Sequence, residues 1–254
     1  LYKRWMLALA SAVACAGFAF LNRGGLIECS AVFIAAGLGQ FLRSTLMKRG
    51  VSHMAIWMAC GFLLAGAYIG LINLLTGLQL IGSEHMVGFI SSILFLVPGF
   101  PMVTGMLDTS RMDLLAGMSR PMYVTVLLVS ASFAVWVLAS LFHLPLAQNA
   151  RPDIPAGLYL LLQVVSSGVA AAGFAMLFAA SPVACVWGGV IAAVANPARI
   201  WLVEAGWTSH MAATLAVFAV GIMAELVAPL HGRQYTRVSL SVTVVVTMVP
   251  GVPF

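Results

Sequence analysis

Long apolar runs joined by short polar connections constrain this sequence more than any other feature. A helix needs about 20 mostly apolar residues to cross the hydrocarbon core of a bilayer. Nine such runs cover 5–21, 25–42, 54–75, 86–105, 121–142, 154–178, 183–203, 211–228 and 238–254. None shows the alternating pattern of a membrane barrel strand, and backbone groups in lipid must be paired within the segment. We therefore predict an all-α polytopic membrane protein.

The charged residues are too few to coat a water-facing surface. They make up 7% of the chain, which is 62% hydrophobic, whereas a soluble domain carries roughly 25% charged residues. This balance excludes a soluble enzyme and makes membrane lipid the surrounding partner. The net charge of +5 does not indicate nucleic acid, because the basic residues stand at the ends of apolar runs and not on one basic face.

The basic residues also fall unevenly on the two sides of the predicted membrane. Arg23 and Arg151 lie on the side away from the N-terminus. The N-terminal side holds Lys3, Arg4, Arg43, Lys48, Arg49, Arg111, Arg120, Arg233 and Arg237. Because Lys and Arg concentrate in cytoplasmic connections, we predict a multi-pass protein of the cell inner membrane with a cytoplasmic N-terminus.

Three short strings recur in the same order along the chain. Ala-Gly-Phe-Ala at 16–19 returns at 172–175, Ser-His-Met-Ala at 52–55 returns at 209–212, and Val-Pro-Gly at 97–99 returns at 249–251. The offsets are 156, 157 and 152 residues. The repeat unit holds five predicted spans, and an odd number places the second copy upside down in the membrane, as in many secondary transporters.

The repeat divides the chain into two predicted units. The first five-helix repeat covers 1–143, a connection covers 144–153, and the second repeat covers 154–254. We expect the second repeat to be truncated, with its tenth span lying beyond Phe254.

Proline and glycine interrupt one predicted span in each repeat, at matching places. Proline removes a backbone donor and glycine lets the backbone unwind. Broken helices at matching positions of two repeats point to a transporter's binding site, although a simple packing kink remains the alternative. The candidate substrate-binding residues at these breaks are Pro98, Gly99, Pro101, Pro250, Gly251 and Pro253.

Polar residues in or beside the spans are the other candidates. Asn196 and Arg199, next to Pro197 and a further expected break, could hold a substrate carboxylate. Of these sites we expect the proline breaks to make the main contact, because the break is duplicated. Arg199 has no counterpart at the same offset in the first repeat, where position 43 lies near a helix end. Glu28 and Asp108 are the predicted proton-coupling residues. The alternatives are that Glu28 reaches the headgroups and that Asp108 pairs with a neighbouring arginine, Arg111.

Motifs for other chemistry are absent from the sequence. It contains no H-E-x-x-H, G-x-S-x-G or Walker motif, so we predict no enzyme, no catalytic residue and no cofactor. The cysteines lie singly in apolar runs, which predicts small buried side chains and no metal site. They are Cys15, Cys29, Cys60 and Cys185. The sequence leaves a homo-oligomer open.

Residues 95–108, Phe-Leu-Val-Pro-Gly-Phe-Pro-Met-Val-Thr-Gly-Met-Leu-Asp, resemble the first-half signature of the threonine/serine exporter (ThrE) family. The Gly24-Gly25 pair, the second Val-Pro-Gly at 249–251 and the two-by-five-span layout are also similar. The resemblance implies export of threonine and serine from the cytoplasm, driven by the proton-motive force. The family also includes two-component relatives implicated in dicarboxylate export.

We therefore predict a secondary transporter that exports threonine and serine by proton antiport, with a carboxylate on its substrate. Two alternatives stay open: an exporter of dicarboxylates such as succinate, and a membrane scaffold that transports nothing. A scaffold has no need of duplicated helix breaks, whereas a transporter does.

Overall fold

The computed structural model describes residues 2–79, 88–142, 154–231, 240–242 and 244–245. All regular structure in these ranges is helical. The elements are α1 (Arg4–Leu21), α2 (Leu26–Lys48), α3 (His53–Gly77), α4 (Phe89–Ser92), η2 (Leu94–Leu96), α5 (Gly99–Ser110), α6 (Leu114–Leu141), α7 (Ala156–Leu177), α8 (Pro182–Glu204), α9 (Ser209–Val227) and η3 (Ala228–His231).

Within the described ranges, seven helices are long and apolar enough to cross a membrane: α1, α2, α3, α6, α7, α8 and α9. The prediction of an all-α polytopic membrane protein is confirmed. The described part of the predicted span over 86–105 is divided into α4, η2 and α5, which agrees with the break predicted at Pro98 and Gly99. Most of the predicted span over 238–254 lies outside the described residues.

Short polar side chains start several helices where the sequence changes from connection to apolar run. Ser52, Asp113, Ser181 and Thr208 are N-caps, and each side chain accepts a hydrogen bond from the N–H three residues on. Such caps satisfy backbone donors that have no partner inside the helix. The cap at Asp113 starts α6 at residue 114, seven residues before the predicted start, and Pro121 is accommodated inside the helix.

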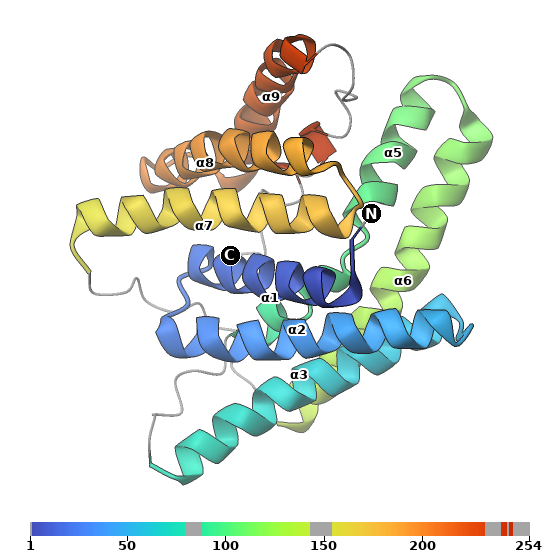
Figure 1. Cartoon of the computed structure of the whole chain (residues 1–254), viewed down its shortest axis with the longest axis vertical. Coiled ribbons are helices and arrows are strands. Elements are labelled where there is room, and N and C mark those ends of the chain that lie inside the picture. The colour runs from blue at the N-terminus through green and yellow to red at the C-terminus, as the bar shows by residue number, and fades with distance from the viewer. Residues whose placement is uncertain (1, 80–87, 143–153, 232–239, 243, 246–254) are drawn as a thin grey trace.

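The helices pack in the order α3, α2, α1, α7, α8, α9, with α1 and α7 in the middle (Figure 1). Helix α6 packs on α3, and α5 packs on α6. The segment of α4 and η2 lies against α1, close to where α2 and α3 also contact α4. The segment before the proline break therefore lies among α1, α2 and α3, and Phe100 after the break contacts the ring of Phe178 at the end of α7.

The central pair, α1 and α7, crosses antiparallel through small residues. A Cβ built on Gly17 would lie 3.0 Å from the carbonyl oxygen of Ser166, and one on Gly173 would lie 2.7 Å from that of Ala10. As residue numbers rise along α1, the numbers of the contacting residues on α7 fall, so the two helices are antiparallel. Small side chains let membrane helices approach this closely in the absence of a hydrophobic driving force.

The turns after the first two helices of each half have the same backbone conformation, 156 residues apart. Arg23 and Ala179 both have positive φ, at 65° and 58°, and Gly50 and Gly206 both do, at 74° and 93°. The N–H of the following residue returns in each case to a carbonyl five residues back, which is a Schellman-type helix end. These matching turns agree with the predicted repeat.

The 156-residue offset of the turns differs by one residue from the offset of one repeated string. The N-caps Ser52 and Thr208 are 156 residues apart, whereas the Ser-His-Met-Ala strings are offset by 157. Those strings are therefore displaced by one residue from structural equivalence. The antiparallel pair of α1 and α7 has the direction that inversion requires, and inversion of the complete halves stays a prediction.

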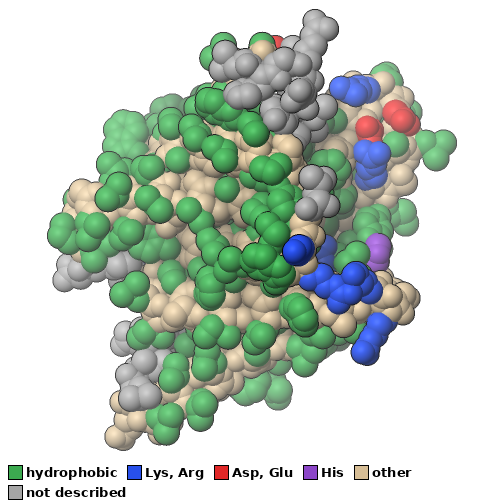
Figure 2. Space-filling model, in the orientation of Figure 1, with side chains coloured by type: hydrophobic (Ala, Val, Ile, Leu, Met, Phe, Trp, Pro, Cys, Tyr) green, Lys and Arg blue, Asp and Glu red, His purple; other side chains and the backbone are tan. Residues whose placement is uncertain are grey.

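The surface carries many apolar side chains, as a lipid-facing surface does. Leu26 is 91% exposed and Leu115 87% exposed. Figure 2 shows hydrophobic side chains spread over the helices, with Lys and Arg gathered toward the end where α1 begins and α2 ends. This gathering agrees with the one-sided distribution of basic residues in the sequence.

Candidate functional site

The helix break predicted at Pro98 and Gly99 is present. The 3₁₀ turn η2 ends at Leu96, Val97 is extended, and α5 begins at Gly99. Pro98 has φ −80° and ψ 63°, outside the helical region, and is the N-cap of α5. The second break, predicted at Pro250, Gly251 and Pro253, lies outside the described residues and stays a prediction.

Each carbonyl that the break removes from helical hydrogen bonding has another partner. The carbonyl of Leu94 accepts from the N–H of Val97 at 3.0 Å, and that of Val97 accepts from the N–H of Gly99 at 2.9 Å. The carbonyls of Phe95 and Leu96, which lie between these two, accept hydrogen bonds from side chains of neighbouring helices. Nη1 of Arg43 donates to Phe95 at 3.4 Å, and Nε1 of Trp57 donates to Leu96 at 2.6 Å.

The restart of the helix at Gly99 leaves few backbone donors free. The N–H of Gly99 bonds to Val97 and that of Met102 bonds to Pro98 at 3.2 Å, while Pro101 has no N–H. Among the described residues in the first turn of α5, Phe100 is the only one whose N–H has no backbone acceptor. The break alone therefore presents one backbone donor to a ligand.

Arg43 and Trp57 form one unit beside the break. The guanidinium carbon of Arg43 lies 4.5 Å from the centre of the Trp57 ring, in cation–π contact. Gln40, one turn earlier on α2, accepts from Nη1 of Arg43 at 3.4 Å. The Nε atom of Arg43 is buried and has no hydrogen-bond partner among the described residues.

Asn196 and Arg199 are brought together, within an unbroken helix. Oδ1 of Asn196 accepts from Nε of Arg199 at 2.9 Å, and Nδ2 of Asn196 donates to Oγ of Ser167 on α7 at 3.0 Å. The break expected at Pro197 is wrong, because α8 runs continuously past this proline. A single missing backbone bond is tolerated where neighbouring helices support the segment.

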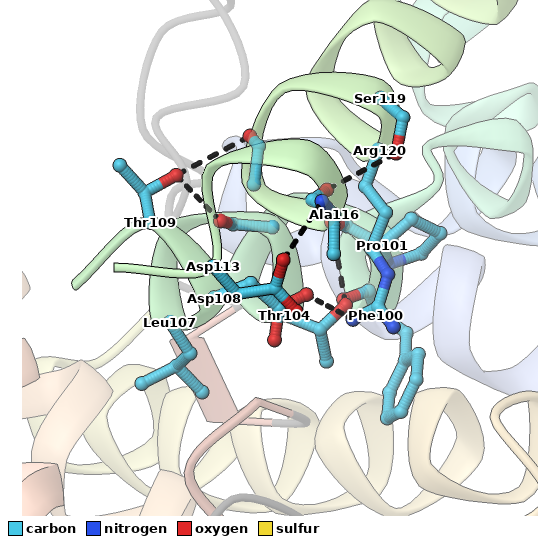
Figure 3. Close-up of polar contacts among 12 residues, drawn as sticks. Phe100, Pro101, Thr104, Leu107, Asp108, Thr109, Asp113, Ala116, Ser119 and Arg120 are labelled. Atoms are coloured by element: carbon cyan, nitrogen blue, oxygen red, sulfur yellow. Dashed lines mark hydrogen bonds and ion pairs between the residues drawn. The ribbon is translucent and has the colours of Figure 1, made fainter. Parts of the chain in front are cut away.

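Asp108 lies near the end of α5 and forms an ion pair with α6. Its Oδ2 is 2.6 Å from Nη1 of Arg120. Figure 3 shows the side chain of Arg120 on α6 extending toward Asp108 on α5, near Phe100 and Thr104, which also belong to α5. The predicted alternative, a pair with Arg111, is wrong; Arg111 is the C-cap residue, where the chain turns away from α5.

Glu28 lies in the first turn of α2 and is only 3% exposed. The alternative in which it reaches the headgroups is therefore wrong. A Cβ built on Gly25 would come within 2.9 Å of Oε2 of Glu28, so the Gly24-Gly25 pair leaves room for this carboxylate. An acidic group at this position is also favoured by the positive end of the helix dipole.

Three residues of this region were not predicted as site residues from the sequence: Gln40, Arg43 and Trp57. The signal that could have found Gln40 and Arg43 is the 156-residue offset, which relates them to Asn196 and Arg199. Trp57 has no such counterpart, because the corresponding residue is Ala213. Its role becomes visible only from the folded position of the break.

The described residues contain no group of three or more His, Cys, Asp or Glu side chains that could hold a metal ion. Within these ranges Cys15, Cys60 and Cys185 are buried and Cys29 is half-buried, and all four are free thiols.

Comparisons with known proteins place the chain in a transporter family. The ThrE family model, described as a threonine/serine exporter, matches residues 1–142, and a second model, described as threonine/serine exporter ThrE, matches residues 163–254. Two curated relatives are each named "Probable succinate transporter subunit YjjP". The Escherichia coli (strain K12) protein is 28% identical and the Klebsiella aerogenes protein 29% identical, each over 119 residues.

The aligned part is 47% of this chain and 45% of each relative, so the chain spans about half the length of the curated relatives it matches. No solved structure matches the chain. Because the first family model alone covers more than half of the sequence, the chain belongs to the threonine/serine exporter (ThrE) family.

Proposed function

We propose that this protein is a secondary transporter that exports small carboxylate-bearing solutes from the cytoplasm, with threonine and serine as the first candidates. The observation that carries the proposal is the break between η2 and α5. Its carbonyls are bonded by Arg43 and Trp57 from two other helices. An irregular backbone among membrane helices is typical of a transporter's binding site.

A carboxylate is the substrate group that best fits this region. The N-terminal end of α5 supplies the positive end of a helix dipole and the N–H of Phe100. Arg43 and Arg199 add two guanidinium groups, which bind carboxylates through paired hydrogen bonds. These groups support carboxylate binding in two regions, one at Pro98, Gly99 and Pro101 beside Arg43 and one at Asn196 and Arg199. The candidate residues of the second break lie outside the described residues.

Proton antiport is the proposed source of energy, with Asp108 or Glu28 as the coupling group. Protonation of Asp108 would remove the negative charge that holds Arg120. The short helix α5 would then lose its ionic connection to α6, and α5 is the helix that begins at the break. The pair thus offers a physical route from a proton to the proposed binding region.

Succinate is the second candidate substrate. It is favoured by the names of the two curated relatives, which describe a succinate transporter subunit. On either substrate, we propose location in the inner membrane with a cytoplasmic N-terminus, supported by the basic residues at the end where α1 begins.

The test is transport by the purified protein in proteoliposomes loaded with labelled threonine, serine or succinate, with and without a pH gradient. We expect efflux of at least one of these solutes, accelerated by a gradient that drives protons inward. Liposomes with a Pro98→Ala/Pro101→Ala variant serve as the control for the break, and they should show much slower efflux. Absence of efflux of all three solutes would leave the membrane scaffold as the better account.

A further inference from the structure

Two sets of three polar residues occupy equivalent positions in the two halves. Each set has a serine on the first helix of its half and an amide and an arginine on the second. The residues of each set are 156 positions from their counterparts: Ser11, Gln40 and Arg43, and Ser167, Asn196 and Arg199. The turn geometry described above shows that this offset is the structural one.

Several other polar residues inside the helices are not shared between the halves. At the same offset, Glu28 corresponds to Ala184 and Tyr68 to Ala224. An ionisable group within a membrane helix is costly and usually has a functional reason. An arginine kept in both halves therefore indicates a task that both halves perform.

The contacts within each set hold the guanidinium and leave part of it open. Nε of Arg199 is bonded to Asn196, and its terminal nitrogens have no hydrogen bond within the described ranges. Arg43 is bonded through Nη1, and its buried Nε has no partner among the described residues. Each arginine thus retains donors that match a carboxylate.

The two sets lie toward opposite ends of the helix layer. Helix α2 returns alongside α1, with Gly37 beside Ala8 and Ala12, and α8 returns alongside α7, with Gly189 beside Gly168 and Ala172. Since α1 and α7 are antiparallel, the last turns of α2 and α8 point in opposite directions, as Figure 1 shows. Arg43 therefore lies near the end where α1 begins, and Arg199 near the other end.

We propose that Arg43 and Arg199 are two equivalent binding residues for the substrate carboxylate, one on each side of the membrane. Arg43 binds the carboxylate when the protein is open on the side where α1 begins, and Arg199 binds it when the protein is open on the opposite side. The inference rests on the proposed function and adds to it the division of binding between two symmetry-related arginines.

The test measures the half-saturating substrate concentration separately at each face of proteoliposomes with known protein orientation. Arg43→Gln should raise it about 10- to 100-fold at the face where α1 begins, the range expected for a lost hydrogen bond to a charged group. The other face should change less than about twofold. Arg199→Gln should show the reverse pattern. Equal effects at both faces, or none at either, would overturn the proposal.

Two controls separate binding from folding. Arg49→Gln, at the exposed C-cap of α2, removes a charge outside both sets and should change neither face. Arg43→Lys keeps the positive charge but lacks the planar fork, so it should fold and still weaken binding at the same face as Arg43→Gln. Full rescue by lysine would contradict paired recognition of a carboxylate by Arg43.

A binding measurement distinguishes failure of this inference from failure of the proposed function. Succinate and threonine should raise the unfolding temperature of the wild-type protein in detergent, and the rise should be smaller in both Arg→Gln variants. If the wild type transports none of the solutes but still shows this pattern, carboxylate binding by the two arginines is supported and the proposed transport function is contradicted. If the ligands stabilise wild type and variants equally, carboxylate binding by the two arginines is contradicted, whether or not the protein transports any of the solutes.

Discussion

Gly173→Ala perturbs the crossing of α1 and α7, on which the arrangement of the two halves depends. The new Cβ would lie 2.7 Å from the carbonyl oxygen of Ala10 and 2.8 Å from the Cβ of Ala14. Ordinary contacts need more than 3 Å, so α1 must move by several tenths of an ångström. Overpacking of this kind costs about 1–3 kcal/mol, and the gain in helix propensity returns up to about 1 kcal/mol. We expect a net loss of about 1–2 kcal/mol.

The assay is reversible unfolding of the purified protein in mixed detergent micelles, followed by circular dichroism. Gly221→Ala in α9 is the matched control, because a Cβ there meets nothing within 4 Å, and it should be neutral or slightly stabilising. Gly17→Ala should fall between the two, since its closest contact is 3.0 Å. Equal stability of the Gly173 and Gly221 variants would refute the close crossing.

Three further predictions concern the break and the proposed transport. Trp57→Phe should destabilise the protein by about 1–3 kcal/mol, because it leaves the buried carbonyl of Leu96 without a donor, whereas Trp136→Phe, at an exposed position of α6, should change unfolding little. Asp108→Asn or Glu28→Gln should reduce proton-driven export while substrate exchange survives, and unchanged pH dependence in both variants would rule these residues out. Threoninol, which lacks the carboxylate, should compete poorly with threonine for export; equal competition would contradict carboxylate recognition.

The spans and the first break could be predicted from the sequence because both depend on local chemistry. Length and hydropathy define a crossing helix without knowledge of its neighbours. Proline at residues 98 and 101 removes two donors whatever surrounds them. The conversion of the predicted span over 86–105 into α4, η2 and α5 follows from these prolines together with Gly99.

The partners of the site residues could not be predicted, because they depend on where the chain turns. Asp108 and Arg111 are three residues apart, a spacing that favours pairing inside a helix, but α5 ends at Ser110. Met112 then takes a φ of 63°, and α6 returns alongside α5 with Arg120. Arg43 lies near the end of a predicted span, and the folded turns select, among the three sequence offsets, the 156-residue register that relates it to Arg199.

The most direct test of the account is the side of the membrane on which equivalent turns lie. Val51 and Trp207 are exposed and 156 residues apart, at the start of the connections to α3 and α9. Each would be changed to cysteine in a background without the four native cysteines and labelled with an impermeant maleimide in right-side-out and inside-out vesicles. The account predicts that Val51→Cys is labelled only from the cytoplasmic side and Trp207→Cys only from the opposite side. Labelling of both from the same side would contradict the inverted duplication and the two-sided transport built on it.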